Sequence, residues 1–152
     1  MEEKTNEKTE EKSRVLFLCT HNSARSQMAE GYLRHVGGDR FEVSSAGTEA
    51  SSVKPEAREA MDEIGIDISG QESKTLERYL GEPFDYVITV CDTANDSCPA
   101  FPGPAERLHW SLPDPSAAEG EERLAVFRSV RDRLKESINE ELVGANVGLD
   151  GG

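Results

Sequence analysis

The 152-residue chain lacks several features that mark membrane, exported or nucleic-acid-binding proteins. No apolar stretch is long enough to cross a bilayer, and the N-terminus lacks the apolar core of a signal peptide. Lys and Arg number 17 against 30 Asp and Glu, and the resulting net charge of −13 disfavours nucleic acids and anionic membranes as partners. We therefore expect a cytoplasmic protein with no nucleic-acid partner and no membrane partner.

Cysteine is also scarce, and its scarcity is informative. The chain has 3 cysteines, Cys19, Cys91 and Cys98, and no Cys-x-x-Cys pair. An odd number of scattered cysteines argues against a framework of structural disulfides and matches no common zinc spacing, so we predict no metal site. The three thiols favour redox or nucleophilic chemistry in a reducing compartment.

The distribution of apolar residues predicts a single α/β domain between two tails. Residues 1–13 are charged and polar after the first, which predicts a disordered tail, and the Gly-rich residues 143–152 predict a flexible one. Strands are expected at 15–19, 41–46, 85–91 and 107–110, and helices at 24–36, 55–64, 73–80 and 119–142. Because strands and helices alternate across residues 14–142, we predict one domain with an open parallel four-stranded sheet and helices on both faces.

The first strand ends in a segment suited to binding an oxyanion. Its apolar residues lead into Cys19, and the polar turn that follows reaches Arg25 where the first helix begins. Backbone N–H groups in such a turn, the helix N-terminus and a guanidinium together favour a tetrahedral anion and a cysteine thiolate. A buried structural thiol and a surface arginine are the ordinary alternatives, but the spacing favours a nucleophile and an anion clamp. The predicted oxyanion-binding residues are Thr20, His21, Asn22, Ser23, Ala24, Arg25 and Ser26.

The other two cysteines predict a disulfide relay. Cys91 ends a second apolar strand, and Cys98 follows a short polar segment. Neighbouring strands lie about 4.8 Å apart, and a disulfide tolerates Cα separations of roughly 4.4–6.8 Å, so Cys19 and Cys91 are expected within bonding range. Attack by Cys98 on Cys91 then moves the disulfide away from the anion site.

These residues resemble a known family, the thioredoxin-coupled arsenate reductases, which share the fold of low-molecular-weight protein tyrosine phosphatases. The resemblance spans about residues 15–142. It is carried by the loop of residues 19–31, Ser45-Ala46-Gly47, Asp67-Ile68-Ser69, Cys91, Cys98 and Asp114-Pro115. The cysteine pair and the Asp-Pro make the match specific, because a Cys-x5-Arg segment by itself occurs in phosphatases of several folds.

The resemblance implies a reaction and a role for Asp114. Cys19 attacks arsenate, and Asp114 acts as the general acid that protonates the departing oxygen. Cys91 and Cys98 then complete the relay, arsenite is released, and thioredoxin reduces the final disulfide. The implied function is arsenic detoxification with no bound cofactor and with a weak phosphatase side activity.

Two departures from the family pattern limit what carries over. Ala24 stands where some relatives have a fourth cysteine. Some members hold a structural potassium ion, and Asn22 and Ser45 match part of that site, but Glu72 and Lys74 do not complete it.

Two alternatives from other classes remain. A low-molecular-weight tyrosine phosphatase needs Cys19, Arg25 and Asp114 but neither of the other cysteines. A non-catalytic oxyanion or redox sensor would use the disulfide as a signal to a partner, and only turnover separates it from an enzyme.

Overall fold

The centre of the molecule is a four-stranded sheet. The structure is a computed structural model that describes residues 13–19, 24–48, 53–90, 106–112, 115 and 118–143. The strands are β1 (Ser13–Cys19), β2 (Phe41–Gly47), β3 (Tyr86–Thr89) and β4 (Glu106–His109). They pair in the order β2-β1-β3-β4, and every pairing is parallel. The expected open parallel four-stranded sheet is therefore confirmed.

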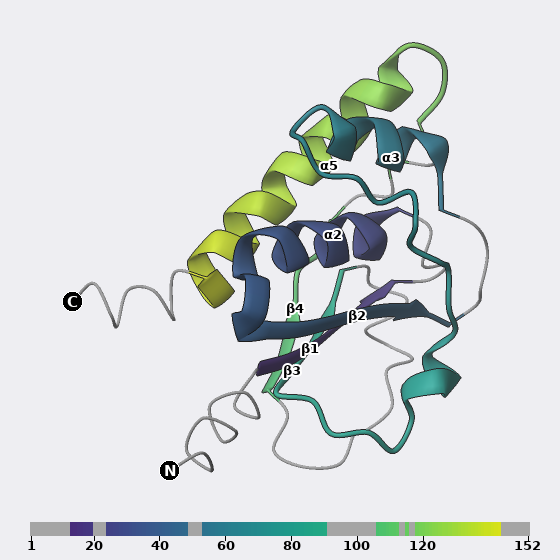
Figure 1. Cartoon of the computed structure of the whole chain (residues 1–152). Coiled ribbons are helices and arrows are strands. Elements are labelled where there is room, and N and C mark those ends of the chain that lie inside the picture. Colours follow the sequence, from purple (N-terminus) through teal and green to yellow (C-terminus); the bar gives the residue numbers. More distant parts are fainter. Residues whose placement is uncertain are drawn as a thin grey trace.

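The helices are arranged unevenly around this sheet. The α-helices are α2 (Arg25–Gly37), α3 (Pro55–Asp62) and α5 (Glu122–Ile138), with the 3-10 helices η1 (Gly38–Arg40) and η2 (Leu76–Tyr79) and the π-helix η4 (Asn139–Val143). Figure 1 shows α2, α3 and α5 together on one side of the sheet, whereas η2 lies beyond β2 on the side away from them. Among the described residues, the α-helices thus cover one face of the sheet, and η2 lies next to the end of β2, where Thr75 forms a parallel bridge with Gly47.

Glycines with positive φ explain where the helix ends differ from the sequence expectation. Gly120 has φ 67°, a left-handed conformation that keeps the chain out of the helix, so α5 begins at Glu122 instead of residue 119. The helix expected at residues 73–80 is only the single 3-10 turn of η2, and Gly81 follows it with φ 85°.

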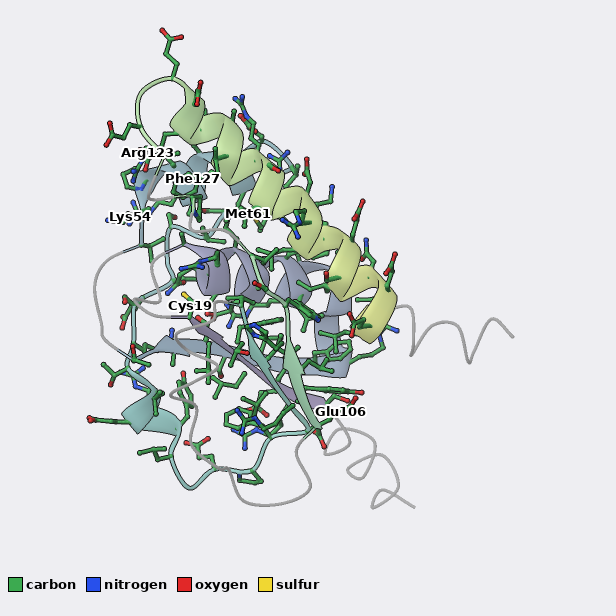
Figure 2. All side chains as sticks on the ribbon, turned by 180° about the vertical axis from the view of Figure 1, so that it is seen from behind. Cys19, Lys54, Met61, Glu106, Arg123 and Phe127 are labelled. Atoms are coloured by element: carbon green, nitrogen blue, oxygen red, sulfur yellow. The ribbon has the colours of Figure 1, made fainter. Side chains whose placement is uncertain are left out.

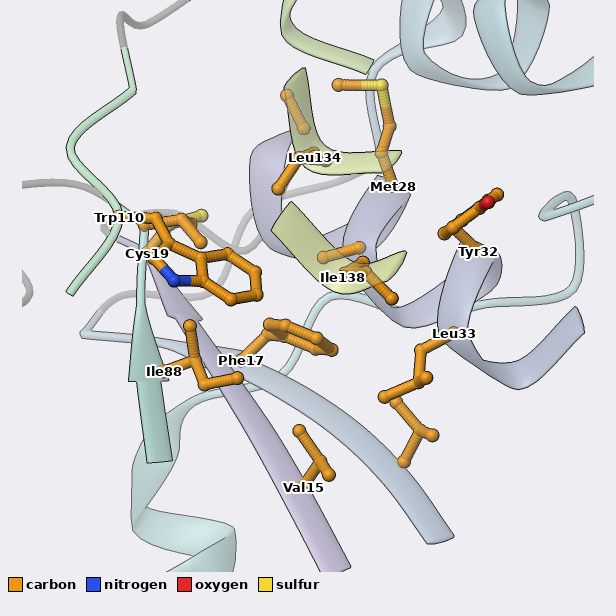
Figure 3. Packing of buried hydrophobic residues seen from close by; sticks show 14 of the residues in the cluster. Val15, Phe17, Cys19, Met28, Tyr32, Leu33, Ile88, Trp110, Leu134 and Ile138 are labelled. Atoms are coloured by element: carbon orange, nitrogen blue, oxygen red, sulfur yellow. The ribbon is translucent and has the colours of Figure 1, made fainter. Parts of the chain in front are cut away.

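The core is built around β1, the most buried strand. Leu16, Phe17 and Leu18 are each at most 1% exposed, so β1 is apolar on both faces, as a central parallel strand requires. Side chains alternate along a strand, which puts Val15, Phe17 and Cys19 on one face. Figure 3 shows this face packed against the buried side chains of α2 and α5.

The strand order places Cys19 at the point where ligands bind in open parallel sheets. The first connection leads from β1 to β2 on one side, and β3 pairs with β1 on the other side. Such a reversal opens a crevice at the carboxyl ends of the strands. Figure 2 shows Cys19 and Glu106, which begins β4, at opposite ends of the sheet.

Residues 1–12 and 144–152 lie outside the described residues, while Ser13 already belongs to β1 and Val143 ends η4. Within the described ranges, no helix is both long and apolar enough to cross a membrane.

Candidate active site

The predicted nucleophile lies buried at the carboxyl end of β1. Cys19 is 2% exposed, has a free thiol, and pairs in register with Gly47 of β2. On the other side of β1, the backbone N–H of Val90 donates to the carbonyl of Leu18 at 2.9 Å. Cys19 is therefore fixed between two neighbouring strands at the crevice that the sheet topology creates.

The first turn of α2 supplies a hydrogen-bond partner for the thiol. Ser26 is fully buried, and its Oγ lies 3.0 Å from the Sγ of Cys19. A hydroxyl can donate to a thiolate, and hydrogen bonds to charged groups are stronger than neutral ones. Ser26 therefore contacts the predicted nucleophile directly.

Cys19 and Ser26 form the active-site corner, and Arg25 joins this corner to a third part of the chain. Its side chain is buried with 8% of the residue exposed, and its Nη1 donates to the backbone carbonyl of Leu112 at 3.1 Å. Leu112 follows β4, so the end of β1, the start of α2 and the segment after β4 meet at one place. A buried guanidinium beside a cysteine is suited to bind a tetrahedral oxyanion through planar, bidentate contacts.

Trp110 forms an apolar part of this corner and was not among the predicted site residues. Its backbone N–H donates to the carbonyl of Thr89 at 2.8 Å, and its ring lies 6.1 Å from that of Phe17, centroid to centroid. Figure 3 shows Trp110 on the same face as Phe17 and Cys19. Its place directly after a strand was the available signal, since the carboxyl ends of parallel strands line the crevice.

The remaining predicted site residues fall outside the described part of the chain. They are Thr20, His21, Asn22, Ser23, Cys91, Cys98 and Asp114. Four predicted positions, Cys19, Ala24, Arg25 and Ser26, are described and lie together. The flanking residues Leu112 and Pro115 are described and buried on either side of the predicted acid.

A buried ionic network that the sequence analysis did not predict lies further along α2. Glu30 is 4% exposed and accepts hydrogen bonds from Ser45 of β2 and Arg34 of α2. The Nζ of Lys74 lies 3.9 Å from the Oε1 of Glu30 and donates to the carbonyl of Glu72 at 2.7 Å. Burial of the ammonium lowers the pKa of Lys74, although the Glu30 carboxylate opposes this shift.

This network does not fit a structural potassium ion. Ser45 already donates to Glu30, and the ammonium of Lys74 supplies a positive charge beside the same carboxylate. Among the described residues, no group of three His, Cys, Asp or Glu side chains is placed to hold a metal. An open cavity of about 620 Å³ borders the network and is lined in part by Arg34, Lys74 and Arg78.

Known proteins resemble this chain over most of its length. The arsenate reductase of Halalkalibacterium halodurans is 52% identical over 126 residues, which cover 82% of this chain and 91% of that protein. A solved structure described as an arsenate reductase in the phosphate binding state superposes with a TM-score of 0.70 at 38% identity, covering 84% of this chain and 95% of the other. A thioredoxin-dependent arsenate reductase of Corynebacterium glutamicum gives a TM-score of 0.63 at 33% identity and covers 85% of this chain and 61% of the other.

These relatives confirm the family resemblance inferred from the sequence motifs. The sequence pattern of the low molecular weight phosphotyrosine protein phosphatases matches residues 14–148. That match includes every described strand and helix from β1 to η4 apart from Ser13. The chain belongs to the low molecular weight phosphotyrosine protein phosphatase family.

Proposed function

We propose that this protein is an arsenate reductase that converts arsenate to arsenite and is regenerated by thioredoxin. The observation that carries the proposal is the buried Cys19 thiol with Ser26 Oγ at 3.0 Å, beside Arg25 at the carboxyl edge of the sheet. Relatives named arsenate reductase give the substrate, and one described as thioredoxin-dependent gives the reductant.

The first step forms a bond between sulfur and arsenic. Arg25 and the N-terminus of α2 hold the oxyanion, and the Cys19 thiolate attacks arsenic. One arsenate oxygen leaves as water after Asp114 donates a proton to it. The product is a covalent adduct of Cys19 in which arsenic is still pentavalent.

The reduction step uses a second thiol. Cys91 attacks the sulfur of Cys19, a disulfide forms between the two cysteines, and the electron pair of the sulfur–arsenic bond stays with arsenic, which leaves as arsenite. Two thiols thereby supply the two electrons. Cys98 then attacks Cys91, releases the Cys19 thiolate, and leaves a Cys91–Cys98 disulfide for thioredoxin to reduce.

A coupled assay tests this function. Purified protein with thioredoxin, thioredoxin reductase and NADPH should oxidise NADPH only when arsenate is added. In the Cys98→Ser variant, one equivalent of arsenite per enzyme should form and the protein should collect as a Cys19–Cys91 disulfide. Normal multiple turnover by that variant would contradict the relay.

The competing phosphatase function is separated by Cys91→Ser. Hydrolysis of an aryl phosphate ends with water and needs no second thiol, so this variant should keep that activity while it releases no arsenite. The arsenate reductase relatives favour reduction over hydrolysis as the main activity. An absence of arsenate-dependent NADPH oxidation by the wild-type protein, with rapid aryl phosphate hydrolysis, would reverse this order.

A further inference from the structure

Arg25 makes a contact that oxyanion binding does not require. Its Nη1 donates to the carbonyl of Leu112 at 3.1 Å, and both residues are 8% exposed. The two residues are 87 positions apart in the sequence, so the contact joins two distant parts of the chain.

The segment that Arg25 contacts leads directly to the predicted acid. Trp110 begins it, held to β3 through the carbonyl of Thr89 and packed on Phe17. Leu112 is its last residue described before Asp114, which follows two positions later. Two residues of chain span at most about 7 Å, so the position of the Leu112 carbonyl restricts where Asp114 can lie.

The chemistry of the guanidinium allows one side chain to serve two partners. It is planar and carries five donors in a rigid arrangement, so a bond from Nη1 to a carbonyl also fixes the orientation of the other donors. A carbonyl has no net charge, and this contact therefore orients Arg25 without neutralising it.

We propose that Arg25, besides binding the oxyanion, is a positioning residue for the general acid: its bond to the Leu112 carbonyl fixes the end of the segment from Trp110 to Leu112, from which the chain continues to Asp114. This inference rests on the proposed function, because it needs Asp114 as the acid. It predicts that substrate binding and acid placement are energetically coupled through one side chain.

The test compares Arg25→Lys in two backgrounds. Lysine keeps the charge but has a single nitrogen, which cannot hold the Leu112 carbonyl and make bidentate contact with an oxyanion. Single-turnover rates are measured at saturating arsenate for the wild type, Arg25→Lys, Asp114→Asn and the double variant. Misplacement of a catalytic group by 1 Å can lower a rate about 10²-fold. When Asp114 is present, the single-turnover rate of Arg25→Lys should therefore fall by about that factor, in addition to any loss from weaker contacts with arsenate.

That additional loss should vanish in the Asp114→Asn background, because no acid remains to be positioned. A control is Arg123→Lys, since the Nη1 of Arg123 also donates to a backbone carbonyl, that of Ala118 at 3.2 Å, but on the helical side of the molecule. This control should leave the rates unchanged in both backgrounds.

A second readout does not depend on turnover. Trp110 is the only tryptophan of the chain, so its fluorescence reports the segment that Arg25 holds. Acrylamide should quench Trp110 more strongly in Arg25→Lys than in the wild type or in Arg123→Lys. Melting curves identify a variant that fails to fold, and Arg25→Met, which is of similar length but has no N–H donor, replaces Arg25→Lys in that case.

The outcomes separate the inference from the proposed function. Equal losses from Arg25→Lys in both backgrounds, with unchanged quenching of Trp110, overturn the inference and leave the arsenate reductase intact. An Asp114→Asn rate within a few-fold of the wild type overturns the acid assignment, and the coupling with it. Absence of turnover by the wild type contradicts the proposed function itself.

Discussion

The arginine of the active-site corner and the arginines of the helical layer, which is formed by α3 and α5, make different kinds of contact. On the helical layer, Arg128 of α5 donates to Glu63 at 2.6 Å, and Arg123 of α5 donates to Glu56 of α3 at 2.9 Å. At the corner, one contact of Arg25 is with the backbone carbonyl of Leu112. Figure 2 shows Arg123 beside Phe127 and Met61 within the helical layer, away from Cys19.

The difference shows how one side chain serves stability in one region and recognition in the other. Carboxylate partners neutralise the helical arginines, and the hydrogen bonds they receive hold the pKa of Glu56 and of Glu63 below the usual value of 4.5. A contact with a carbonyl, by contrast, orients a guanidinium without itself bringing a negative charge to it. In a chain of net charge −13, a dianion has to be captured by such a local positive site against the overall field.

Among substitutions in the active-site corner, Cys19→Ser is expected to have the largest effect on activity. Reduction and phosphate hydrolysis both begin with attack by this sulfur, so both activities should be abolished. The melting temperature should change little, because serine is close in size to cysteine and no disulfide of the resting protein is lost. Arsenite formation and aryl phosphate hydrolysis measure the loss, and substantial reduction by this variant would remove Cys19 from its role.

Asp114→Asn should give the next largest loss. Asparagine keeps the shape of the side chain but does not supply the proton, and general acids typically contribute about 10²–10⁴-fold. The single-turnover rate should fall by about that factor while arsenate binding is little changed. A rate within a few-fold of the wild type would place the acid elsewhere in the chain.

Much of the fold, and the contact between Cys19 and Ser26 in the active-site corner, could be predicted from the sequence for physical reasons. The apolar residues 15–18 before Cys19 include no charged side chain, so the burial of this run as a central strand follows from its composition. Ser26 follows Cys19 by 7 positions and lies in the first turn of α2, and geometry over so short a separation is set largely by nearby residues. The Cys19–Ser26 contact was therefore predictable.

Contacts between distant segments were not accessible in the same way. Nothing local to Leu112 marks its carbonyl as the partner of Arg25, because backbone groups carry no sequence signature. The burial of Glu30 was hidden for a related reason: its partners Ser45 and Lys74 come from other elements and appear as ordinary polar residues until the chain folds. The roles of Cys91, Cys98 and Asp114 stay predictions.

Ser26→Ala is expected to have an intermediate effect on the reactivity of Cys19. Loss of the hydroxyl removes the 3.0 Å contact to the Cys19 sulfur, and a hydrogen bond to a charged group is worth about 1.5–3 kcal/mol. Alkylation of Cys19 by iodoacetamide at neutral pH, followed by peptide mapping, should slow about tenfold or more, since about 1.4 kcal/mol corresponds to a factor of ten.

The matched control is Ser45→Ala. Ser45 is also fully buried and hydrogen bonded, but its partner is Glu30 and not the thiol. This variant should lower the melting temperature without slowing alkylation of Cys19. Equal alkylation rates in Ser26→Ala and the wild type would contradict a role for Ser26 in stabilising the thiolate.

The smallest effect is expected on the helical layer, from Glu56→Gln. The pair with Arg123 is partly exposed, and such pairs contribute about 0.2–1 kcal/mol, which for a chain of this size lowers the melting temperature by at most about 4 °C. The rate of arsenate reduction should be unchanged at temperatures well below the transition.

The pH dependence of this small effect identifies its cause. The hydrogen bond from Arg123 lowers the pKa of Glu56 in the folded protein below the usual 4.5, so between these two values the unfolded chain binds more protons. The stabilisation is therefore complete above pH 4.5 and is lost as the pH falls through the lowered pKa. Melting curves of the wild type and Glu56→Gln should differ at pH 7 and converge in acid. If the difference in melting temperature stayed constant into acid, the pair would act through packing. Loss of arsenate reduction in Glu56→Gln at pH 7 would contradict the conclusion that the pair between Glu56 and Arg123 serves stability alone.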